Sequence, residues 1–174
     1  MNGRFRSFSF VDRITLCTDT RIEGHYTLPH AAGEFPASLM AEAVGQLAAW
    51  ASMSQLDFAW RPVAGLAAEA RYGQVPRPGQ TLKLAAEIER CDAEAVAYSG
   101  CATIDGQSAV EIMDCVGPML PMEQFDAPEA VRADFATLCG DGQHEAQVLP
   151  GVIRHARLRG VVLMPCRFCG RLQV

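Results

Sequence analysis

One charged residue interrupts the most apolar stretch of this chain. Residues 35–56 read FPASLMAEAVGQLAAWASMSQL, and Glu42 is the only ionisable side chain among them. Apolar residues cover nearly every direction around a 3.6-residue period, which indicates a helix that is buried on most sides. Phe35 and Pro36 mark its start, because proline is tolerated in the first helical turn, where its missing N–H is not needed. We therefore expect one long buried helix from about Pro36 to Ser54.

Glu42 is the candidate site residue on this helix. A carboxylate in apolar surroundings must be hydrogen-bonded, paired with a charge or protonated, because burying an isolated charge is costly. Gln46 lies one turn further along the same face, at i+4. The alternative is a glutamate whose face meets solvent or an arginine across an interface. We favour a functional role, since ionisable groups in apolar settings cluster at functional sites.

The composition of the 174-residue chain fits one domain with an appendage. A hydrophobic content of 49% with 20% charged residues indicates a globular core. The net charge of −5 excludes general nucleic-acid binding, which needs a basic surface. No uncharged apolar run reaches the about 18 residues of a membrane span, and the N-terminus lacks the apolar segment of a signal peptide. Seven cysteines, an odd number, are read as reduced thiols of a cytoplasmic protein.

Strand-like segments lie on both sides of the expected helix. Two precede it, at residues 4–17 and 20–28, and four follow it, at 63–72, 81–90, 95–104 and 108–119. Asp105-Gly106 is a strong hairpin signal between the last two. A short second helix is expected from about Pro128 to Leu138, with Asp126 as its N-cap. One long helix followed by an antiparallel meander belongs to the α+β class.

Two segments resemble the motifs of a known enzyme family. Residues 35–46 read FPASLMAEAVGQ, and residues 70–82 read ARYGQVPRPGQTL. The first is similar to the central-helix motif M-P-G-x-L-x-x-E-A-x-x-Q of the 3-hydroxyacyl-(acyl carrier protein) dehydratases, with the same spacing. The second resembles the A-R-F-x-x-x-V-x-P-G-D-x-L segment of that family. Weaker similarities at residues 10–13 and 102–106 extend the resemblance over residues 4–120.

The resemblance implies a hot-dog fold, in which an antiparallel sheet wraps around one long central helix, as a homodimer with its sites at the subunit interface. It implies a cofactor-free lyase that dehydrates 3-hydroxyacyl thioesters, carried on acyl carrier protein or CoA, in fatty acid or polyketide-type metabolism. Glu42 matches the carboxylate that assists departure of the hydroxyl, and Gln46 matches the glutamine of the motif. Ala37 stands where the family has a glycine whose N–H stabilises the thioester oxygen. Arg71 is expected to help bind the acidic carrier.

The catalytic histidine is the point at which the chain departs from the family. The family places it fourteen residues before the carboxylate, and this chain has Leu28 there. His30, two residues away, is the favoured base. His25 is the alternative, and also a candidate substrate-binding residue, because Gly24-His25-Tyr26 copies the start of the motif. Both stay open, as does the interpretation that neither is catalytic.

Two further functions are compatible with these residues. Hot-dog thioesterases also use a helix carboxylate, as base or nucleophile, and need no histidine, so Glu42 and Gln46 would suffice. The third function is that of a non-catalytic acyl-binding subunit. Measuring enoyl formation and thiol release separately distinguishes the three.

The composition changes near residue 140, which predicts a hot-dog domain at residues 1–139 and a basic tail at 140–174 with little regular structure. The tail has five arginines against Asp141 and Glu145. Cys166 and Cys169 have the spacing of half a zinc site. Since no second pair follows, we expect no metal.

Overall fold

The computed structural model describes residues 9–33, 35–63 and 65–140. In that part of the chain, seven antiparallel strands and two helices follow one another, with a short 3-10 turn before the second helix. They are β1 (Arg13–Cys17), β2 (Arg21–Thr27), α1 (Ala37–Gln55), β3 (Trp60–Pro62), β4 (Leu66–Tyr72), β5 (Thr81–Cys91), β6 (Ala95–Ile104), β7 (Gln107–Pro121), η2 (Met122–Gln124) and α2 (Pro128–Cys139). The predicted α+β class is confirmed. The strand predicted at residues 63–72 is observed as β4, and β3, just before that range, was not predicted.

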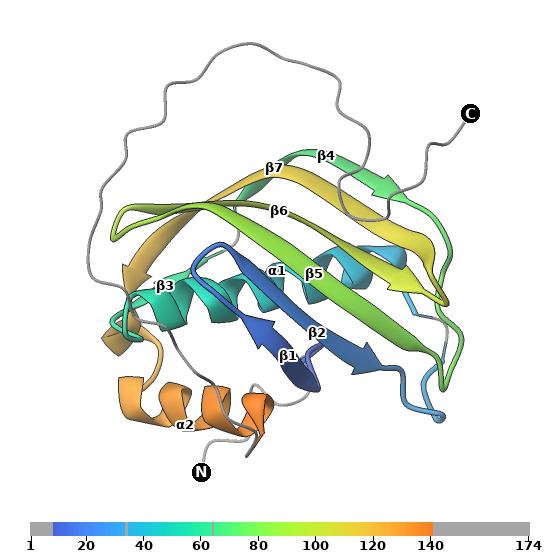
Figure 1. The fold of residues 1–174 in the computed structure, drawn as a ribbon, viewed down its shortest axis with the longest axis horizontal. Coiled ribbons are helices and arrows are strands. Elements are labelled where there is room, and N and C mark those ends of the chain that lie inside the picture. The colour runs from blue at the N-terminus through green and yellow to red at the C-terminus, as the bar shows by residue number, and fades with distance from the viewer. Residues whose placement is uncertain (1–8, 34, 64, 141–174) are drawn as a thin grey trace. The chain divides into compact units, whose positions relative to one another are not determined.

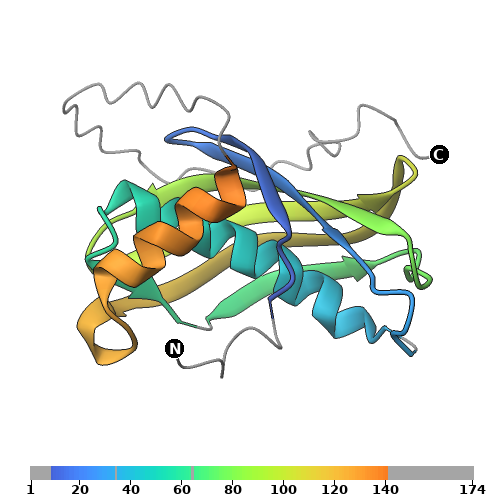
Figure 2. The ribbon, with the colours of Figure 1, turned by 90° about the horizontal axis from the view of Figure 1, so that it is seen from below.

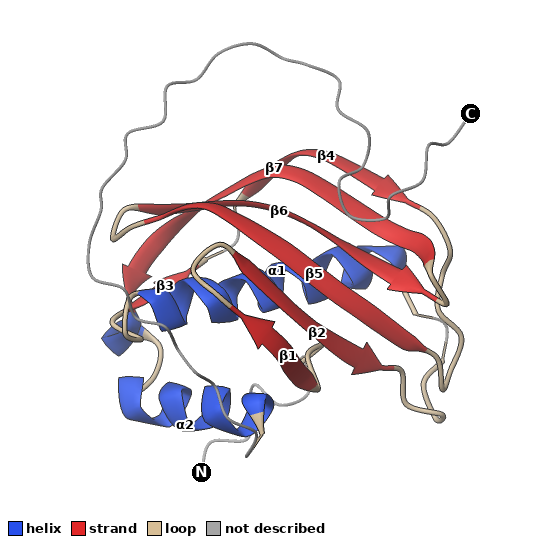
Figure 3. Ribbon diagram, in the orientation of Figure 1, coloured by secondary structure: helices blue, strands red, loops and turns tan. Residues whose placement is uncertain are grey.

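The sheet curls around α1. Its strand order is β1-β2-β5-β6-β7-β3. The edge of β7 that faces away from β6 has two partners: β4 pairs with residues 110–116 of β7, and β3 pairs with residues 119–121. Figures 1 and 3 show the strands arching over α1, which lies along their concave side. The predicted arrangement of an antiparallel sheet wrapped around one central helix is therefore confirmed.

The helix α1 forms where the apolar periodicity predicts it. Pro36 has an extended conformation (φ −61°, ψ 136°) and α1 begins at the next residue, so proline stands just outside the hydrogen-bonded turns. The buried stripe of α1 packs on the inward side chains of the strands, which alternate as expected for a half-buried sheet. The fully buried residues at this contact are Met40, Ala43, Val44, Leu47 and Ala51 of the helix, and Ile22, Leu82, Ala86, Ala102 and Val110 of the sheet.

The hairpin between β6 and β7 has the predicted turn. Asp105 and Gly106 both have left-handed backbone conformations, with φ of 51° and 80°. Two successive residues with positive φ are what a two-residue hairpin loop of type I′ requires. The signal was read correctly because glycine, and to a lesser degree aspartate, tolerate this conformation.

A β-bulge interrupts β7. Tyr98 pairs with Cys115 and Gly100 with Ile112, so one residue of β6 lies opposite two residues of β7. Asp114, one of those two, has φ of 50°. The extra residue shifts the alternation of the strand: Ile112 is buried before the bulge, and Cys115 is buried after it. The bulge therefore turns the Cys115 side chain toward α1, where strict alternation would point it outward.

The second helix covers part of the first. Figure 2 shows α2 lying beside the C-terminal half of α1 and leaving the N-terminal half uncovered. A small apolar cluster joins them, with Phe135 of α2 packed near Trp50 of α1 at a ring-centroid distance of 6.0 Å. The predicted limits of α2 are confirmed to within one residue. The prediction of Asp126 as the N-cap is wrong: Ala127 is the N-cap residue, and Asp126, one position earlier, accepts a hydrogen bond from the N–H of Ala127.

Two other expectations concern parts of the chain that are only partly described. The strand expected at residues 4–17 is observed as β1 over its last five residues. The basic tail and the Cys166–Cys169 pair lie outside the described residues, so the domain boundary stays a prediction. No helix of the described ranges is long and apolar enough to cross a membrane.

Candidate active site

Glu42 lies on the exposed side of α1, away from the buried stripe that contains Met40 and Leu47. Its Oε1 accepts a 2.9 Å hydrogen bond from Nε2 of Gln46. Gln46 is itself fixed, because its Oε1 accepts a 2.9 Å hydrogen bond from the backbone N–H of Phe10. The predicted pair of Glu42 and Gln46 is thus brought together, with the amide orienting the carboxylate.

The burial expected for this part of the helix is not observed in the single chain. Ala41 and Gly45 flank Glu42 on α1 and are partly buried, whereas Glu42 is exposed. The physical reason is that the sheet covers one side of α1 only, and α2 packs further along, at Ala49 and Trp50. Solvent therefore reaches the Glu42 carboxylate, as the alternative interpretation of the sequence allowed.

Tyr98 meets α1 close to Glu42 in the sequence of the helix, a contact that the sequence did not reveal. It lies on the inward side of β6, and a Cβ atom added to Gly45 would come within 3.2 Å of its hydroxyl oxygen. The hydroxyl is hydrogen-bonded to the thiol of Cys115, its cross-strand neighbour. Burial is the main reason that the pKa of Tyr98 lies above its ordinary value, and the charges of Cys115 and Glu42 raise it further. The available signal was Gly45 itself, since glycine inside a helix often marks a close approach.

The start of α1 supplies backbone N–H groups. Ala37 is the first residue of the helix, no side chain caps this end, and the first turn contains no acidic residue. The positive end of the helix dipole is therefore not compensated by a carboxylate on its own first turn. Such an end can stabilise an oxyanion, which is the role predicted for the N–H of Ala37. That role stays a prediction.

The two histidines lie in different places. A Cβ added to Gly24 on β2 would approach Leu47 of α1, so position 24 faces the helix. His25 is the next residue of the strand, so its side chain lies on the opposite, outer face of the sheet. His30 is exposed in the loop between β2 and α1, and its ring packs against Gly79, 2.5 Å from where a Cβ of that residue would lie. Among the described residues, no hydrogen bond joins either histidine to Glu42.

Arg71 is on β4 and not on α1. Its Nε donates a 2.6 Å hydrogen bond to Oε1 of Glu69, and both side chains are exposed. The chain thus places Arg71 at an edge of the sheet, where its predicted role in substrate binding is untested.

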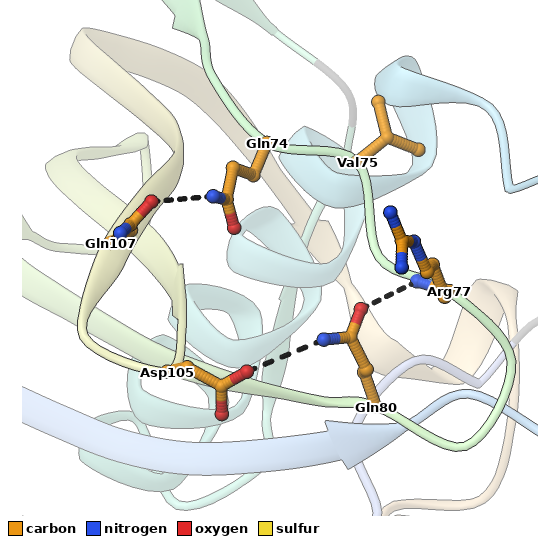
Figure 4. A pocket seen from close by; sticks show the side chains of 6 residues that line it. All are labelled: Gln74, Val75, Arg77, Gln80, Asp105 and Gln107. Carbon is orange, nitrogen blue, oxygen red and sulfur yellow. Dashed lines mark hydrogen bonds between the residues drawn. The ribbon is translucent and has the colours of Figure 1, made fainter.

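A polar depression of about 430 Å³ lies beside the β6–β7 hairpin. Figure 4 shows its lining side chains, which are Gln74, Val75, Arg77, Gln80, Asp105 and Gln107. The side chain of Gln80 connects two parts of the lining. Its Oε1 accepts a 2.8 Å hydrogen bond from the backbone N–H of Arg77, and its Nε2 donates a 3.3 Å hydrogen bond to Oδ2 of Asp105. None of the residues predicted for the site lines this depression, so it is separate from Glu42.

The described residues contain no group of three histidine, cysteine, aspartate or glutamate side chains that could hold a metal ion. The five cysteines among them are free thiols: Cys17, Cys91, Cys101, Cys115 and Cys139. Burial raises the pKa of Cys115, while its hydrogen bond with Tyr98 acts in the opposite direction.

No protein-family model matches the sequence. No curated protein matches it either. The structure, in contrast, resembles solved structures. A fluoroacetyl-CoA thioesterase superposes with a TM-score of 0.52 at 13% identity, over 68% of this chain and 96% of the other. A conserved protein from Pseudomonas aeruginosa gives 0.54 at 10% identity, over 69% and 96%. A hypothetical thioesterase from Streptococcus pneumoniae TIGR4, solved with coenzyme A, gives 0.50 at 9% identity, over 63% and 85%.

These likenesses correct the predicted activity. Two of the three proteins are described as thioesterases, which are hydrolases, and the assignment of this chain as a dehydratase lyase is therefore wrong. The structure gives a physical reason, because the position of the family histidine is occupied by Leu28, which is 1% exposed in the core. At sequence identities of 9–13%, the structural similarity shows a shared fold. The chain has the hot-dog fold of these proteins.

Proposed function

We propose that this protein is a hot-dog acyl thioesterase that uses Glu42 to hydrolyse acyl thioesters. The supporting observation is the Glu42 carboxylate, which is exposed on the central helix and oriented by Gln46 at 2.9 Å. A carboxylate that water can reach is suited to hydrolysis. The reason to expect Glu42 as a proton-donating acid was its burial, which the single chain does not provide.

The proposed reaction needs one carboxylate and one water. Glu42 accepts a proton from the water, whose oxygen attacks the thioester carbonyl carbon. The C–S bond then breaks, and the proton passes to the departing sulfur, which gives a carboxylic acid and a thiol. In the nucleophilic variant of this chemistry, Glu42 attacks the carbonyl first and water cleaves the resulting anhydride. In this proposal the N–H groups at the start of α1, Ala37 among them, stabilise the negative charge on the carbonyl oxygen.

The proposed substrate is an acyl group linked to CoA. Support comes from the likeness to a thioesterase solved with coenzyme A and to a thioesterase of fluoroacetyl-CoA. An acyl group on acyl carrier protein is the alternative, and comparing the two substrates at equal acyl length decides between them.

The test measures thiol release from acyl-CoA esters of increasing chain length by the full-length protein and by Glu42→Gln. We expect Glu42→Gln to lower kcat by roughly 10²–10⁴-fold, the usual contribution of a general base. Glu129→Gln is the matched control, because Glu129 is an exposed glutamate in the first turn of α2. Thiol release that is absent in the wild type, or undiminished in Glu42→Gln, would contradict the proposal. Binding without thiol release would favour an acyl-binding subunit.

We also propose that two copies of the chain pair through β4. All seven residues of β4 are exposed, and β7 is its only strand partner within the described ranges. Leu66 is 83% exposed, and Val116, its neighbour on β7, is 51% exposed. An exposed strand edge with apolar side chains is a template for pairing with another chain. Antiparallel pairing centred on Ala70 would place Glu69 opposite the partner subunit's Arg71, and the symmetry repeats this contact.

Charge reversal tests this dimer. Arg71→Glu would place glutamates opposite one another, and we expect each of the two contacts to weaken the dimer by up to about 1 kcal/mol. Glu69→Arg combined with Arg71→Glu restores opposite charges and should restore the dimer. Sedimentation over a range of concentrations measures the dissociation constant, with Arg90→Glu as a control at a hairpin remote in sequence. A wild-type protein that is monomeric at all concentrations would refute the arrangement.

A further inference from the structure

The segment just before β1 connects the sheet to the exposed half of α1. Asp12 is bonded to β2 twice: its N–H donates a 2.8 Å hydrogen bond to the carbonyl oxygen of His25, and its Oδ2 accepts a 2.7 Å hydrogen bond from the N–H of Thr27. Two residues earlier, the N–H of Phe10 donates a 2.9 Å hydrogen bond to Oε1 of Gln46 on α1. The segment therefore ties a side chain of the helix to the sheet.

The side chain of Phe10 fixes the position of this N–H. Its ring is 6% exposed and meets two other aromatic rings edge-on, at centroid distances of 5.4 Å to Tyr26 and 5.8 Å to Phe35. Tyr26 is on β2, and Phe35 lies two residues before α1. Edge-to-face packing of this kind is favourable. Because the ring is buried between the sheet and the start of α1, the N–H of Phe10 keeps one direction toward the helix.

This N–H determines which way the amide of Gln46 points. A backbone N–H only donates, so the atom of Gln46 that meets it must be the oxygen. The amide nitrogen then lies on the other side and donates its 2.9 Å hydrogen bond to Oε1 of Glu42. Side-chain pairs four residues apart on an exposed helix face are weak by themselves. Without Phe10 the amide would be free to turn its oxygen toward the carboxylate, and two acceptors would face one another.

The two oxygens of Glu42 have different surroundings. Oε1 accepts the hydrogen bond from Gln46. Oε2 has no hydrogen-bond donor among the residues that the structure describes. An ionised carboxylate is acceptor-only, so the second oxygen is the one that stays open to a water molecule.

We propose that Phe10 is a positioning residue of the Glu42 site and acts through its backbone N–H. It sets the amide of Gln46, the amide holds Oε1 of Glu42, and Oε2 is left to accept the proton of the attacking water. This role rests on the proposed thioesterase function and adds to it the segment that orients the base. Since the N–H belongs to the main chain, every side chain except proline would keep it.

Replacing the amide of Phe10 by an ester deletes this N–H and keeps the ring. Cys17 makes the exchange practicable, because a synthetic segment of residues 1–16 with 3-phenyllactic acid at position 10 joins to residues 17–174 by native chemical ligation. The reference is the same ligation product with all its amides. We expect kcat for thiol release from one acyl-CoA to fall roughly threefold to tenfold, the usual weight of one hydrogen bond. KM should stay essentially unchanged, because the acting group is the base and not a substrate contact.

The matched control is an ester at Asp12, made with malic acid in the same synthetic segment. It deletes the main-chain hydrogen bond to His25, two residues away, and leaves the bond from Phe10 to Gln46 in place. We expect both esters to lower stability in urea denaturation by a similar amount, and only the ester at Phe10 to lower kcat. Equal losses of kcat in the two esters would show a merely structural role and overturn the inference.

A double substitution tests whether Phe10 acts through Gln46. In a Gln46→Met background the ester at Phe10 should cause no further loss of kcat, since the amide that it orients is gone. A full additional loss in that background would contradict the proposed relay.

A measurement that does not depend on turnover covers the case in which an ester variant fails to fold. With ¹⁵N at Phe10 alone, its amide gives one resonance in the intact protein. We expect Gln46→Met to shift this resonance and to speed its exchange with solvent. Gln55→Met is the control, because Gln55 is on the same helix and donates to the carbonyl oxygen of Asp19 instead. A Phe10 resonance that ignores Gln46→Met would overturn the inference.

The outcomes separate the two proposals. A wild-type protein that releases no thiol overturns the thioesterase function, and the role of Phe10 with it. An active wild type together with full kcat in the ester at Phe10 overturns the role of Phe10 alone. A loss of kcat that is absent from the ester at Asp12 and disappears in the Gln46→Met background supports both.

Discussion

The two halves of α1 are similarly apolar but have different surroundings. In the C-terminal half, Trp50 and Met53 pack against α2 and the η2 turn, so this half is covered by the sheet on one side and by a helix on the other. In the N-terminal half, the side away from the sheet carries Ser38 and Glu42 and is exposed. An apolar helix can therefore be covered by its own chain over one half and leave the other half open.

The difference separates stability from function within one helix. Large side chains in the covered half bury apolar area, and this burial stabilises the fold. Small residues in the open half, Ala41 and Gly45, allow other groups to approach the helix closely, and one carboxylate stands among them. We therefore expect substitutions in the covered half to affect unfolding, and substitutions in the open half to affect turnover.

The largest effect on stability is expected for Phe135→Ala. Phe135 is partly buried, packing between Trp50 and Phe58, and its truncation should lower the free energy of unfolding by about 2 kcal/mol. Urea denaturation measures this loss. Glu42→Gln should change the same quantity by less than about 0.5 kcal/mol, as for an exposed residue. Similar losses from both substitutions would show that the two halves do not differ in this way.

A smaller effect is expected at alkaline pH. Burial, with the nearby Cys17 charge, raises the pKa of Cys139 from 9.0 to about 11, while Arg13 acts in the opposite direction. Between pH 9 and 11 the folded chain keeps this proton and the unfolded chain releases it, so the free energy of unfolding falls as pH rises. Cys139→Ala should reduce that slope in urea denaturation.

The control for this pH dependence is Val131→Ala, at another buried position of α2. It should lower stability by a similar amount at every pH and leave the slope unchanged. If the free energy of unfolding of Cys139→Ala fell with pH as steeply as that of the wild type, the expected titration of Cys139 would be contradicted.

The smallest effect is expected for Arg132→Ala. Arg132 of α2 forms a 2.6 Å ion pair with Asp57, just after α1, but both groups are largely exposed. Exposed pairs contribute less than about 1 kcal/mol, and the contribution should shrink further in 1 M salt. Thermal unfolding at two salt concentrations measures it. If Arg132→Ala lowered the free energy of unfolding more than Phe135→Ala does, ionic contacts rather than apolar packing would hold α2 against α1.

The elements were predictable because their signals are local. Pro36 marked the start of α1, and Asp105-Gly106 marked the last hairpin, since each residue type restricts its own backbone. The pairing of Glu42 with Gln46 was predictable for the same reason, because helical geometry fixes side chains four residues apart.

The remaining parts of the site depend on contacts between distant segments. Nothing near Tyr98 in the sequence indicates that it meets Gly45, more than fifty residues earlier, or that a bulge at Asp114 turns Cys115 toward it. The activity was wrongly predicted because motif spacing does not report where a histidine side chain points. His25 faces away from α1, and His30 packs on Gly79.

The sequence by itself determined a long apolar helix, its antiparallel strands and the carboxylate on the helix, because periodicity and turn residues act over a few positions. Tertiary structure alone decided that solvent reaches Glu42, that α2 covers only the second half of α1, and that a tyrosine hydroxyl lies against Gly45 of that helix. The physical reason is that burial and hydrogen bonding between segments depend on how the sheet curls, and a local pattern does not encode that curvature.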